Sequence, residues 1–430
     1  MKIVKVIHGY PPAYNAGSEV YSQTVCETLS KRHEVHVFTR EENPFLPDYT
    51  VRKIQGSVTK HLINIPLLRQ RYRYQHNVVD DAFSNLIQTI NPHIIHIGHL
   101  NHLSTSLLDR VNTIPVVFTL HDYWLLCPRG QFIQRNPENP QEVWKNCDGQ
   151  ENRKCAERCY AGYFSGDEKE REEDTNYWTG WVRRRQEHLK KVLERVDVFI
   201  APSRYLLERF EKELPLVQGK IIYLDYGFDT KRLQNRKREP EEHFVFGYIG
   251  THTPQKGIHV LLNALENLKG SWRLRIWGRF RSEITGALQQ MASTLPVDVQ
   301  RKIEWYPEYN NEEIMEIFNQ VDCIVVPSIW VENSPLVIHE AQQVGVPVIT
   351  ANVGGMKEFV HHNKNGLLFD FRNSESLRHH MQQLVDNPKW AKDLGQKRYL
   401  YSKTGDVVFI DHHVEQIETI YKTLLKRSVA

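Results

Sequence analysis

Short runs of Val, Ile and Phe alternate along the chain with longer segments in which apolar residues recur at helical spacing. Strands that alternate with helices predict parallel sheets built from right-handed crossover units. The strand-like runs lie at 3–7, 35–39, 93–97, 116–120 and 196–201 in the first half, and at 244–249, 274–277, 323–326 and 346–349 in the second. The pattern therefore predicts an α/β protein with two consecutive doubly wound domains.

Residues 226–243 separate the two series of strands and are polar, charged and nearly free of aliphatic side chains, which is typical of an interdomain linker. We predict a Rossmann-like N-terminal domain over 1–225 and a Rossmann-like C-terminal domain over 226–405. Ligands of such sheets bind beyond the carboxyl ends of the strands, so two facing domains predict a cleft between them. A last helix, over about 406–427, carries an apolar stripe and could pack back on the N-terminal domain.

The 430 residues include 55 Lys and Arg against 52 Asp and Glu, a formal charge of +3. This balance is too even for a dedicated nucleic-acid-binding protein, although it is compatible with a local basic patch. No apolar run approaches the ~20 residues of a membrane-spanning helix, and the chain opens on a strand-like segment rather than a signal-peptide core. These features predict a cytoplasmic protein that binds no nucleic acid.

The sharpest local motif is VPSIWVENSPLVIHEA, in the second half of the chain. A buried strand ends in this motif, and Asn333 or Ser334 is expected to cap a helix that begins at Pro335. The free amides at the start of this helix would bind an anion such as phosphate. Glu332 and Glu340 could hold opposite ends of an elongated ligand, because carboxylates accept hydrogen bonds from sugar hydroxyls. In the alternative interpretation, both glutamates are solvated or capping residues.

A second unit of strand, turn and helix is predicted over 246–265. Gly250 ends the strand, and Lys256 lies where the start of a helix would present it to phosphate. The turn matches neither a Walker A loop nor the dinucleotide-binding G-x-G-x-x-G, which argues against an NTPase or a dehydrogenase. The alternative is a plain turn with a surface lysine.

Two loops of the first half carry further candidates. Gly17 allows close approach of a ligand to the backbone, and Glu19 opens the next helix. His121 and Asp122 follow a buried strand, which places them at the expected edge of the cleft. In the alternative interpretations, the segment around Gly17 is only a long loop between strand and helix, and His121 is a structural histidine.

These motifs occur in the order seen in family 4 retaining glycosyltransferases of the GT-B fold, which the chain resembles over nearly its full length. The matching segments are G-S-E at 17–19, T-L-H-D at 119–122, A-P-S at 201–203, I-G-(x)5-K-G at 249–257, the pair Glu332 and Glu340, V-G-G-M-K-E at 353–358 and N-G-L-L-F at 365–369. The resemblance implies two Rossmann-like domains that face each other across a cleft. It places a sugar nucleotide mainly on the C-terminal domain and the acceptor mainly on the N-terminal domain.

The resemblance also assigns roles to residues. Glu340 would hold the ribose of the donor, and Lys256 and the Gly17 amide would face its diphosphate. Glu332 and the amides of Asn333, Ser334 and Leu336 would hold the donor sugar, and His121 would contact this sugar near its reacting face. His121, Glu332 and Lys256 are thus the implied catalytic residues. The reaction is transfer to a hydroxyl with retention at the anomeric carbon and no obligatory metal, and preorganised cations and amides must stabilise the leaving diphosphate.

One position departs from the family. An arginine often follows the glycine of the phosphate loop, and here that position is Thr251. Either Lys256 and helix amides are enough to bind the donor phosphates, or Arg279 or Arg281, in the loop after the next strand, takes the place of the family arginine. A sugar phosphorylase or epimerase on the same fold, and a non-catalytic sugar-nucleotide-binding protein, are the alternative functions.

Four of the six cysteines, Cys127, Cys147, Cys155 and Cys159, are separated by 19, 7 and 3 residues. Their spacing resembles an imperfect zinc-ribbon pattern, so a structural zinc is one interpretation. An iron–sulfur cluster or a redox-sensitive pair, and unliganded thiols, are the others.

Two stretches, 67–75 and 177–191, mix basic and aromatic residues and could lie on an anionic membrane surface, or they are solvated helical faces. We therefore expect a cytoplasmic enzyme, with possible peripheral contact at the inner face of the membrane. Its donor would be a UDP-, GDP-, ADP- or dTDP-sugar. Its acceptor would be a glycan, a lipid-linked molecule or a small molecule, in cell-surface polysaccharide or glycoconjugate synthesis.

Overall fold

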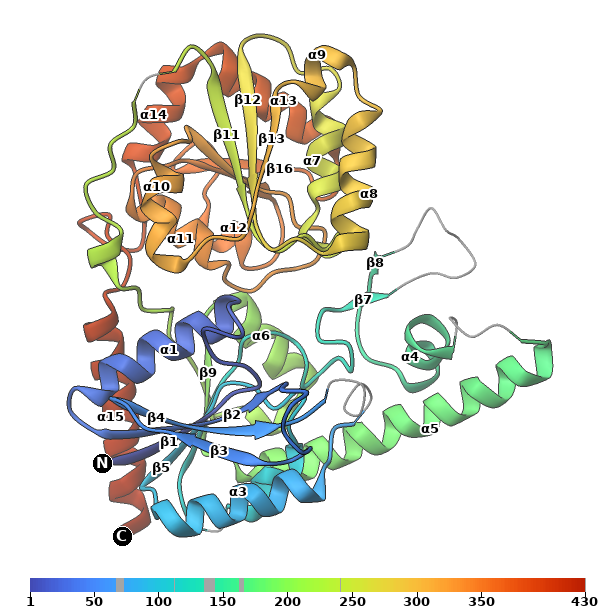
Figure 1. Ribbon diagram of the computed structural model, residues 1–430, viewed down its shortest axis with the longest axis vertical. Helices are drawn as coiled ribbons and strands as arrows, with labels where there is room; N and C mark the ends of the chain where they lie inside the picture. Colours follow the sequence, from blue (N-terminus) through green and yellow to red (C-terminus); the bar gives the residue numbers. More distant parts are fainter. Residues whose placement is uncertain (67–72, 112, 135–143, 162–165, 240, 430) are drawn as a thin grey trace. The chain divides into compact units, whose positions relative to one another are not determined.

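The computed structural model describes residues 1–66, 73–111, 113–134, 144–161, 166–239 and 241–429. The chain forms two compact units, and each is described by itself (Figure 1). Unit 1 consists of Met1–Phe228 with the C-terminal segment Ile410–Ala430, and unit 2 is Asp229–Phe409.

Unit 1 is built on an eight-stranded sheet of order β10-β9-β6-β5-β1-β2-β4-β3, in which only β3 runs antiparallel to its neighbour. The strands are β1 Lys2–Val6, β2 Glu34–Glu41, β3 Val51–Ile54, β4 Val58–Asn64, β5 Ile94–Ile97, β6 Val116–Thr119, β9 Val198–Ala201 and β10 Ile221–Tyr223. The five predicted strands are confirmed as β1, β2, β5, β6 and β9. The strands β3, β4 and β10 were not predicted: β3 and β4 are partly exposed and lack a continuous apolar run, and β10 is only three residues long.

Helices flank this sheet. They are α1 Gly17–Ser30, α3 Asn77–Ile90, α4 Asn152–Cys159, α5 Glu168–Val192, α6 Arg204–Glu213 and α15 Ile410–Val429, with the short helices η1 Thr105–Arg110, η4 Leu193–Arg195 and η5 Pro215–Val217. A small hairpin, β7 Ile133–Gln134 and β8 Lys145–Asn146, lies outside the sheet. Figure 1 shows the long helix α5 with α4 alongside it.

The last helix, α15, packs on unit 1 and contacts α1. Its Ile417 and Tyr421 side chains are fully buried, as the apolar stripe of the sequence requires. The Tyr421 hydroxyl is 2.6 Å from Nδ1 of His96 in β5. The C-terminal helix thus contacts a central strand of the sheet through two residues that are 325 positions apart in the sequence.

Unit 2 has a six-stranded, fully parallel sheet of order β13-β12-β11-β14-β15-β16. Its strands are β11 Phe244–Ile249, β12 Trp272–Trp277, β13 Ile303–Tyr306, β14 Cys323–Val326, β15 Val348–Ala351 and β16 Gly366–Phe369. Its helices are α7 Ile258–Leu265, α8 Ser282–Ser293, α9 Val297–Gln300, α10 Ile314–Phe318, α11 Leu336–Gln343, α12 Met356–Phe359, α13 Ser374–Asp386 and α14 Pro388–Gln396, with η6 Thr230–Arg232, η7 Pro254–Lys256 and η8 Asn311–Glu313. The four predicted strands are confirmed, and β13 and β16 were missed.

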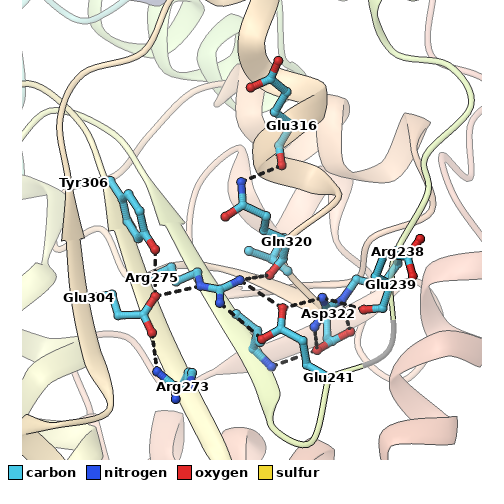
Figure 2. A network of polar contacts seen from close by, with 12 residues as sticks. Arg238, Glu239, Glu241, Arg273, Arg275, Glu304, Tyr306, Glu316, Gln320 and Asp322 are labelled. Carbon is cyan, nitrogen blue, oxygen red and sulfur yellow. Dashed lines mark hydrogen bonds and ion pairs between the residues drawn. The ribbon is translucent and has the colours of Figure 1, made fainter.

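The polar segment after Phe228 is held on unit 2 by ion pairs rather than left as a free tether (Figure 2). Arg238 Nε lies 2.8 Å from Asp322 Oδ1, just before β14. Glu241, just before β11, accepts hydrogen bonds from both Arg238 and Arg275. Arg275 also binds Glu304 at 2.9 Å. The charged composition that predicts a linker therefore reflects a network that joins this segment to the starts of the strands.

Across the described parts of the chain, none of the helices is both long enough and apolar enough to cross a lipid bilayer.

Lys5 is a buried charge in the central strand β1, with a residue exposure of 1%. Its ammonium group has no hydrogen-bond partner among the described residues. Burial lowers the pKa of Lys5 from 10.5 to about 8, and the nearby Cys26 thiol only partly opposes this effect. Because the charged form is penalised in the folded state alone, Lys5 destabilises the fold at neutral pH.

We predict that Lys5→Met raises the free energy of unfolding at pH 7 by up to about 3 kcal/mol, the equivalent of the fall in pKa from 10.5 to about 8. The folded protein of wild-type sequence releases its proton first, so its stability should rise between pH 8 and 10.5 and approach that of the variant. Urea unfolding of the full chain at several pH values measures both effects. Lys53→Met, at an exposed position of the edge strand β3, is the control. A variant that is no more stable than wild type at pH 7 would contradict the prediction.

Candidate functional site

The carboxyl edge of the unit 2 sheet brings together two motifs that are far apart in sequence. Lys256, after β11, lies with its Nζ 2.8 Å from Oε1 of Glu332, after β14, 76 residues away. Ser328 Oγ donates a hydrogen bond to the same carboxylate oxygen. The Glu332 side chain is only 7% exposed, whereas Lys256 is 33% exposed. A ligand can therefore reach Lys256, whereas the Glu332 carboxylate is held in place by Lys256 and Ser328.

Gly257 explains why the two loops can approach so closely. Its φ of +74° is in the left-handed region, and a Cβ at this position would lie 1.9 Å from the carbonyl oxygen of Pro327. Only glycine fits both conditions. The turn that carries Lys256 is thus pressed directly against the backbone that leads to Glu332.

A third motif, V-G-G-M-K-E, closes the other side of the Glu332 loop. The Gly355 amide donates to the Glu332 carbonyl at 2.9 Å. Glu332, Asn333 and Ser334 are all about 95% buried. The loop before α11 is therefore a packed structure rather than a surface turn.

The predicted cap of this helix is wrong. The helix α11 begins at Leu336, and Pro335 is the N-cap residue, with no side-chain hydrogen bond to the helix. Asn333 Oδ1 instead accepts from the amide of Ser334, its own neighbour, so it does not reach the helix start.

Glu340 lies inside α11 and is 6% exposed. Its Oε1 is 2.7 Å from Nη2 of Arg232, and Arg232 Nη1 also binds Asn311 Oδ1 at 2.8 Å. Arg232 was not predicted from the sequence, because it is one of several basic residues in a polar segment with no distinguishing spacing. A buried carboxylate needs a compensating cation or hydrogen bonds. The expected burial of Glu340 is therefore the one feature of the sequence that could have prompted a search for a basic partner.

Thr251 and Arg279 lie on neighbouring loops, after β11 and β12. The amide of His252, next to Thr251, donates to the Arg279 carbonyl at 3.3 Å. The Arg279 side chain is 2.8 Å from Glu308, in a pair with both partners more than one third exposed. Exposed pairs of this kind contribute little to stability.

In unit 1, His121 follows β6 and contacts the aromatic side chains of Tyr21 and Tyr226. Its Nδ1 is 2.7 Å from the hydroxyl of Tyr226, and its ring lies edge-on to Tyr21 at 5.4 Å. Burial lowers the pKa of His121 well below the usual value, so the imidazole is neutral at physiological pH. Tyr226, just before the end of the main part of unit 1, was not found from the sequence. Gly17 is the first residue of α1, and Glu19 Oε1 is 3.4 Å from His8 Nε2.

The structure does not support the zinc site. All six cysteines are free thiols, and among the described residues no group of three or more His, Cys, Asp and Glu side chains could hold a metal ion. Cys155 and Cys159 instead pack in an apolar cluster with Tyr160, Trp178 and Val182. Burial raises the pKa of Cys155 to about 12 and also raises those of Cys147 and Cys159.

The two basic and aromatic stretches meet in unit 1, although residues 67–72 lie outside the described part of the chain. Tyr74 packs edge-on against Trp181 of α5 at 5.5 Å. Arg185 does not belong to the basic surface: it is 1% exposed and donates to the Trp124 carbonyl at 2.6 Å. Within the stretch 177–191, the exposed basic residues are Arg183, Arg184, Lys190 and Lys191.

Two family models match the chain. The model "Glycosyltransferase Family 4" matches residues 16–232, and "Glycosyl transferases group 1" matches residues 229–400. An uncharacterised glycosyltransferase of Methanocaldococcus jannaschii is 26% identical over 208 residues, which cover 48% of this chain and 55% of that protein. The D-inositol 3-phosphate glycosyltransferase of Rhodococcus jostii is 32% identical over 152 residues, 34% of this chain and 33% of that protein. The matched region thus spans about half or less of these relatives.

Solved structures share the fold over nearly the whole chain. The sucrose-phosphate synthase of Thermosynechococcus elongatus has a TM-score of 0.70 at 18% identity, and each chain is covered to 99%. Anabaena Alr3699/HepE in complex with UDP and glucose has a TM-score of 0.65 at 16% identity, with 98% of this chain and 100% of that chain covered. These neighbours are GT-B glycosyltransferases, and the two α/β units with parallel sheets confirm that fold class. The chain belongs to glycosyltransferase family 4.

Proposed function

We propose that this glycosyltransferase moves a sugar from a nucleoside diphosphate sugar to a hydroxyl acceptor with retention at the anomeric carbon. The observation that carries the proposal is the group formed by Lys256, Ser328 and Glu332 at the carboxyl edge of the unit 2 sheet. It combines a partly exposed cation with an oriented carboxylate, at the sheet edge where α/β folds bind ligands.

In this proposal, the donor is bound by unit 2. Glu340 accepts hydrogen bonds from the ribose hydroxyls, and Lys256 faces the diphosphate. Glu332 and the loop and helix amides at Asn333, Ser334 and Leu336 hold the donor sugar. Thr251 and Arg279 lie on adjacent loops and would line the phosphates. Buried carboxylates suit this task because each can bind two vicinal hydroxyls without a competing water.

The chemistry needs stabilisation of the charge that develops on the leaving diphosphate. Lys256 supplies a fixed positive charge, and the Gly17 amide, at the first turn of α1, supplies a donor from unit 1. His121 would contact the donor sugar as a neutral imidazole, which can donate and accept hydrogen bonds without adding charge. With these groups the reaction would need no catalytic metal.

The donor nucleotide and the acceptor belong to the same proposal. Anabaena Alr3699/HepE was solved with UDP and with UDP-glucose, so UDP-sugars are the first donors to test. A role in cell-surface polysaccharide or glycoconjugate synthesis, in the cytoplasm, rests on the resemblance to the family.

We also propose peripheral contact with an anionic membrane surface through α5. Arg183, Arg184, Lys190 and Lys191 are exposed on this helix, and Tyr177 beside them is 59% exposed. Basic side chains and an aromatic ring together suit the headgroup region of a bilayer.

The proposed reaction can be tested directly. With UDP-, GDP-, ADP- and dTDP-sugars as donors, one nucleotide should be released, and NMR of the transferred sugar should show the anomeric configuration of the donor. Activity should be unchanged by EDTA, because Lys256 and backbone amides take the part of a metal. Inversion of the anomeric centre, or loss of activity with EDTA that Mg²⁺ restores, would contradict the mechanism.

Glu340→Ala should weaken binding of the selected nucleotide about 100-fold, because it removes two charge-assisted hydrogen bonds to the ribose. Titration calorimetry on the full chain measures the effect. The control is Glu375→Ala, which removes an exposed carboxylate of unit 2 from the first turn of α13. Undiminished nucleotide binding by Glu340→Ala would refute the assignment.

Replacement of Arg183, Arg184, Lys190 and Lys191 by Gln should reduce cosedimentation with liposomes that contain anionic phosphatidylglycerol by at least tenfold, since each basic side chain contributes about 1 kcal/mol near such a surface. The matched control replaces four exposed lysines of unit 2, namely Lys364, Lys389, Lys392 and Lys397. Equal binding of both variants would remove the proposed membrane contact.

A further inference from the structure

Arg232 is the cation that the structure places on Glu340, and its side chain joins two parts of unit 2. Its Nη2 donates a hydrogen bond to Glu340 Oε1 at 2.7 Å. Its Nη1 donates twice to Asn311, to Oδ1 at 2.8 Å and to the carbonyl oxygen at 3.2 Å. Among the described residues, Glu340 forms an ion pair with no other cation. The guanidinium therefore links η8, which follows β13, to the helix α11.

The Arg232 side chain is well placed because its own segment is fixed on unit 2. Arg232 ends the short helix η6, where the Asp229 side chain accepts a hydrogen bond from the Lys231 amide at 3.1 Å. Four residues further along, Arg236 donates to the carbonyl oxygen of Val321 at 2.6 Å. The backbone is thus held on both sides of Arg232, so less conformational entropy is lost when the guanidinium meets a carboxylate.

The contact with Arg232 leaves acceptor positions on Glu340 for a ligand. A carboxylate has about four lone-pair positions on its two oxygens, and Arg232 uses one of them. Among the described residues, none donates a hydrogen bond to the second oxygen, Oε2. The Glu340 side chain is 7% exposed, so few water molecules compete for these positions. Glu340 is therefore oriented and still able to accept hydrogen bonds from two hydroxyl groups.

Stability alone does not account for this ion pair. The cost of taking two charges out of water largely cancels their attraction, and an apolar pair of similar volume is often as stable. The side chains of Arg232 and Glu340 are 18% and 7% exposed, so both bear this cost. A carboxylate that must be ready for a ligand does need such a partner, because a buried carboxylate without a cation takes up a proton or turns toward water.

We propose that Arg232 is a positioning residue of the donor site, which holds the Glu340 carboxylate in the orientation that selects for the sugar hydroxyls of the nucleotide. The assignment rests on the proposed function, in which Glu340 binds the ribose. Arg232 acts only through Glu340, and Asn311 fixes the guanidinium. An acceptor that is already oriented adds affinity, because binding does not have to order it.

Binding of nucleotides and of analogues without the sugar hydroxyls tests this role. The probes are UDP, GDP, ADP and dTDP, each with its 2′,3′-dideoxy analogue, and titration calorimetry on the full chain gives the ratio of the two dissociation constants. The wild-type protein should prefer its nucleotide by about tenfold for each sugar hydroxyl. Arg232→Met should bind that nucleotide about tenfold more weakly and its analogue within about twofold of wild type, because only the hydroxyl contacts depend on Glu340.

A double-mutant cycle separates positioning from a general effect on the fold. Glu340→Gln nearly keeps the shape of the side chain, but a neutral amide needs no cation. In the Glu340→Gln background, Arg232→Met should change nucleotide binding by no more than about twofold, whereas two independent effects would multiply.

Two further variants keep the test open if Arg232→Met does not fold. Arg232→Lys keeps the positive charge but not the forked contact with Asn311 and Glu340, so its preference for the nucleotide should lie within about threefold of wild type. Asn311→Ala removes the contact with Arg232 at 2.8 Å and keeps the carbonyl contact, so it should lower the preference about threefold.

The matched control is Arg238→Met. Arg238 belongs to the same segment, is 14% exposed and forms an ion pair with a carboxylate, that of Asp322, at 2.8 Å (Figure 2). Asp322 directly precedes β14, so this pair lies at the start of a strand and not at α11. Arg238→Met should leave the preference for the nucleotide over its analogue within about twofold of wild type, even if the variant is less stable.

The outcomes distinguish this role of Arg232 from the proposed function. If the wild-type protein binds none of the nucleotides, or if Glu340→Gln binds nucleotide and analogue as wild type does, the donor assignment fails and the role of Arg232 fails with it. If Glu340→Gln loses the preference and folded Arg232→Met keeps it, the role of Arg232 alone fails.

Two other results would also overturn the positioning role. Tighter nucleotide binding by Arg232→Met would mean that the guanidinium competes with the ribose, and equal weakening of nucleotide and analogue would mean a general effect on the fold. A loss of preference in Arg232→Met that disappears in the Glu340→Gln background, and that Arg238→Met does not share, would support it.

Discussion

The parallel arrangement of strands is the constraint on which the candidate sites depend. In a parallel sheet all strands end at the same edge, so loops that are distant in sequence become neighbours. In unit 2, the loops after β11 and β14 bring Lys256 to Glu332 across 76 residues. In unit 1, the ends of β1, β5 and β6 bring together His8, His99 and His121. Each group is assembled by the sheet of its own unit.

Burial of charge is the second common feature. Its energetic cost explains why several buried charged side chains have an ion-pair or hydrogen-bond partner. Removal of a carboxylate from water is expensive unless a cation or hydrogen bonds compensate for it. Glu332 has Lys256 and Ser328, and Glu340 has Arg232. Lys5 has no such partner and lowers its pKa instead. The paired carboxylates belong to the candidate ligand site. Lys5 instead lies within the central strand β1, away from the strand ends where ligands bind.

Particular residues show how far sequence reasoning reaches. Buried strands such as β11 and β14 were predictable, because a continuous apolar run has few alternatives. The edge strand β3, which has no buried residue, and the partly exposed strand β4 were not, because polar residues interrupt their apolar positions. Arg232 and Tyr226 were missed because their roles depend on contacts across 108 and 105 residues. Arg185, which looks like a member of a basic surface, is buried because its stem and guanidinium pack against Trp124.

The order of motifs in the sequence determined the family, the GT-B fold and the positions of Glu332, Glu340 and Lys256, because each motif encodes a local turn or helix start beside a strand. Tertiary structure alone decided which polar groups meet. It paired Glu340 with Arg232, packed Cys155 and Cys159 in an apolar cluster, and brought His8 into contact with His99. The physical reason is that local patterns follow from backbone geometry and short-range hydrogen bonds, whereas pairing of buried polar groups depends on which strands are neighbours in the sheet.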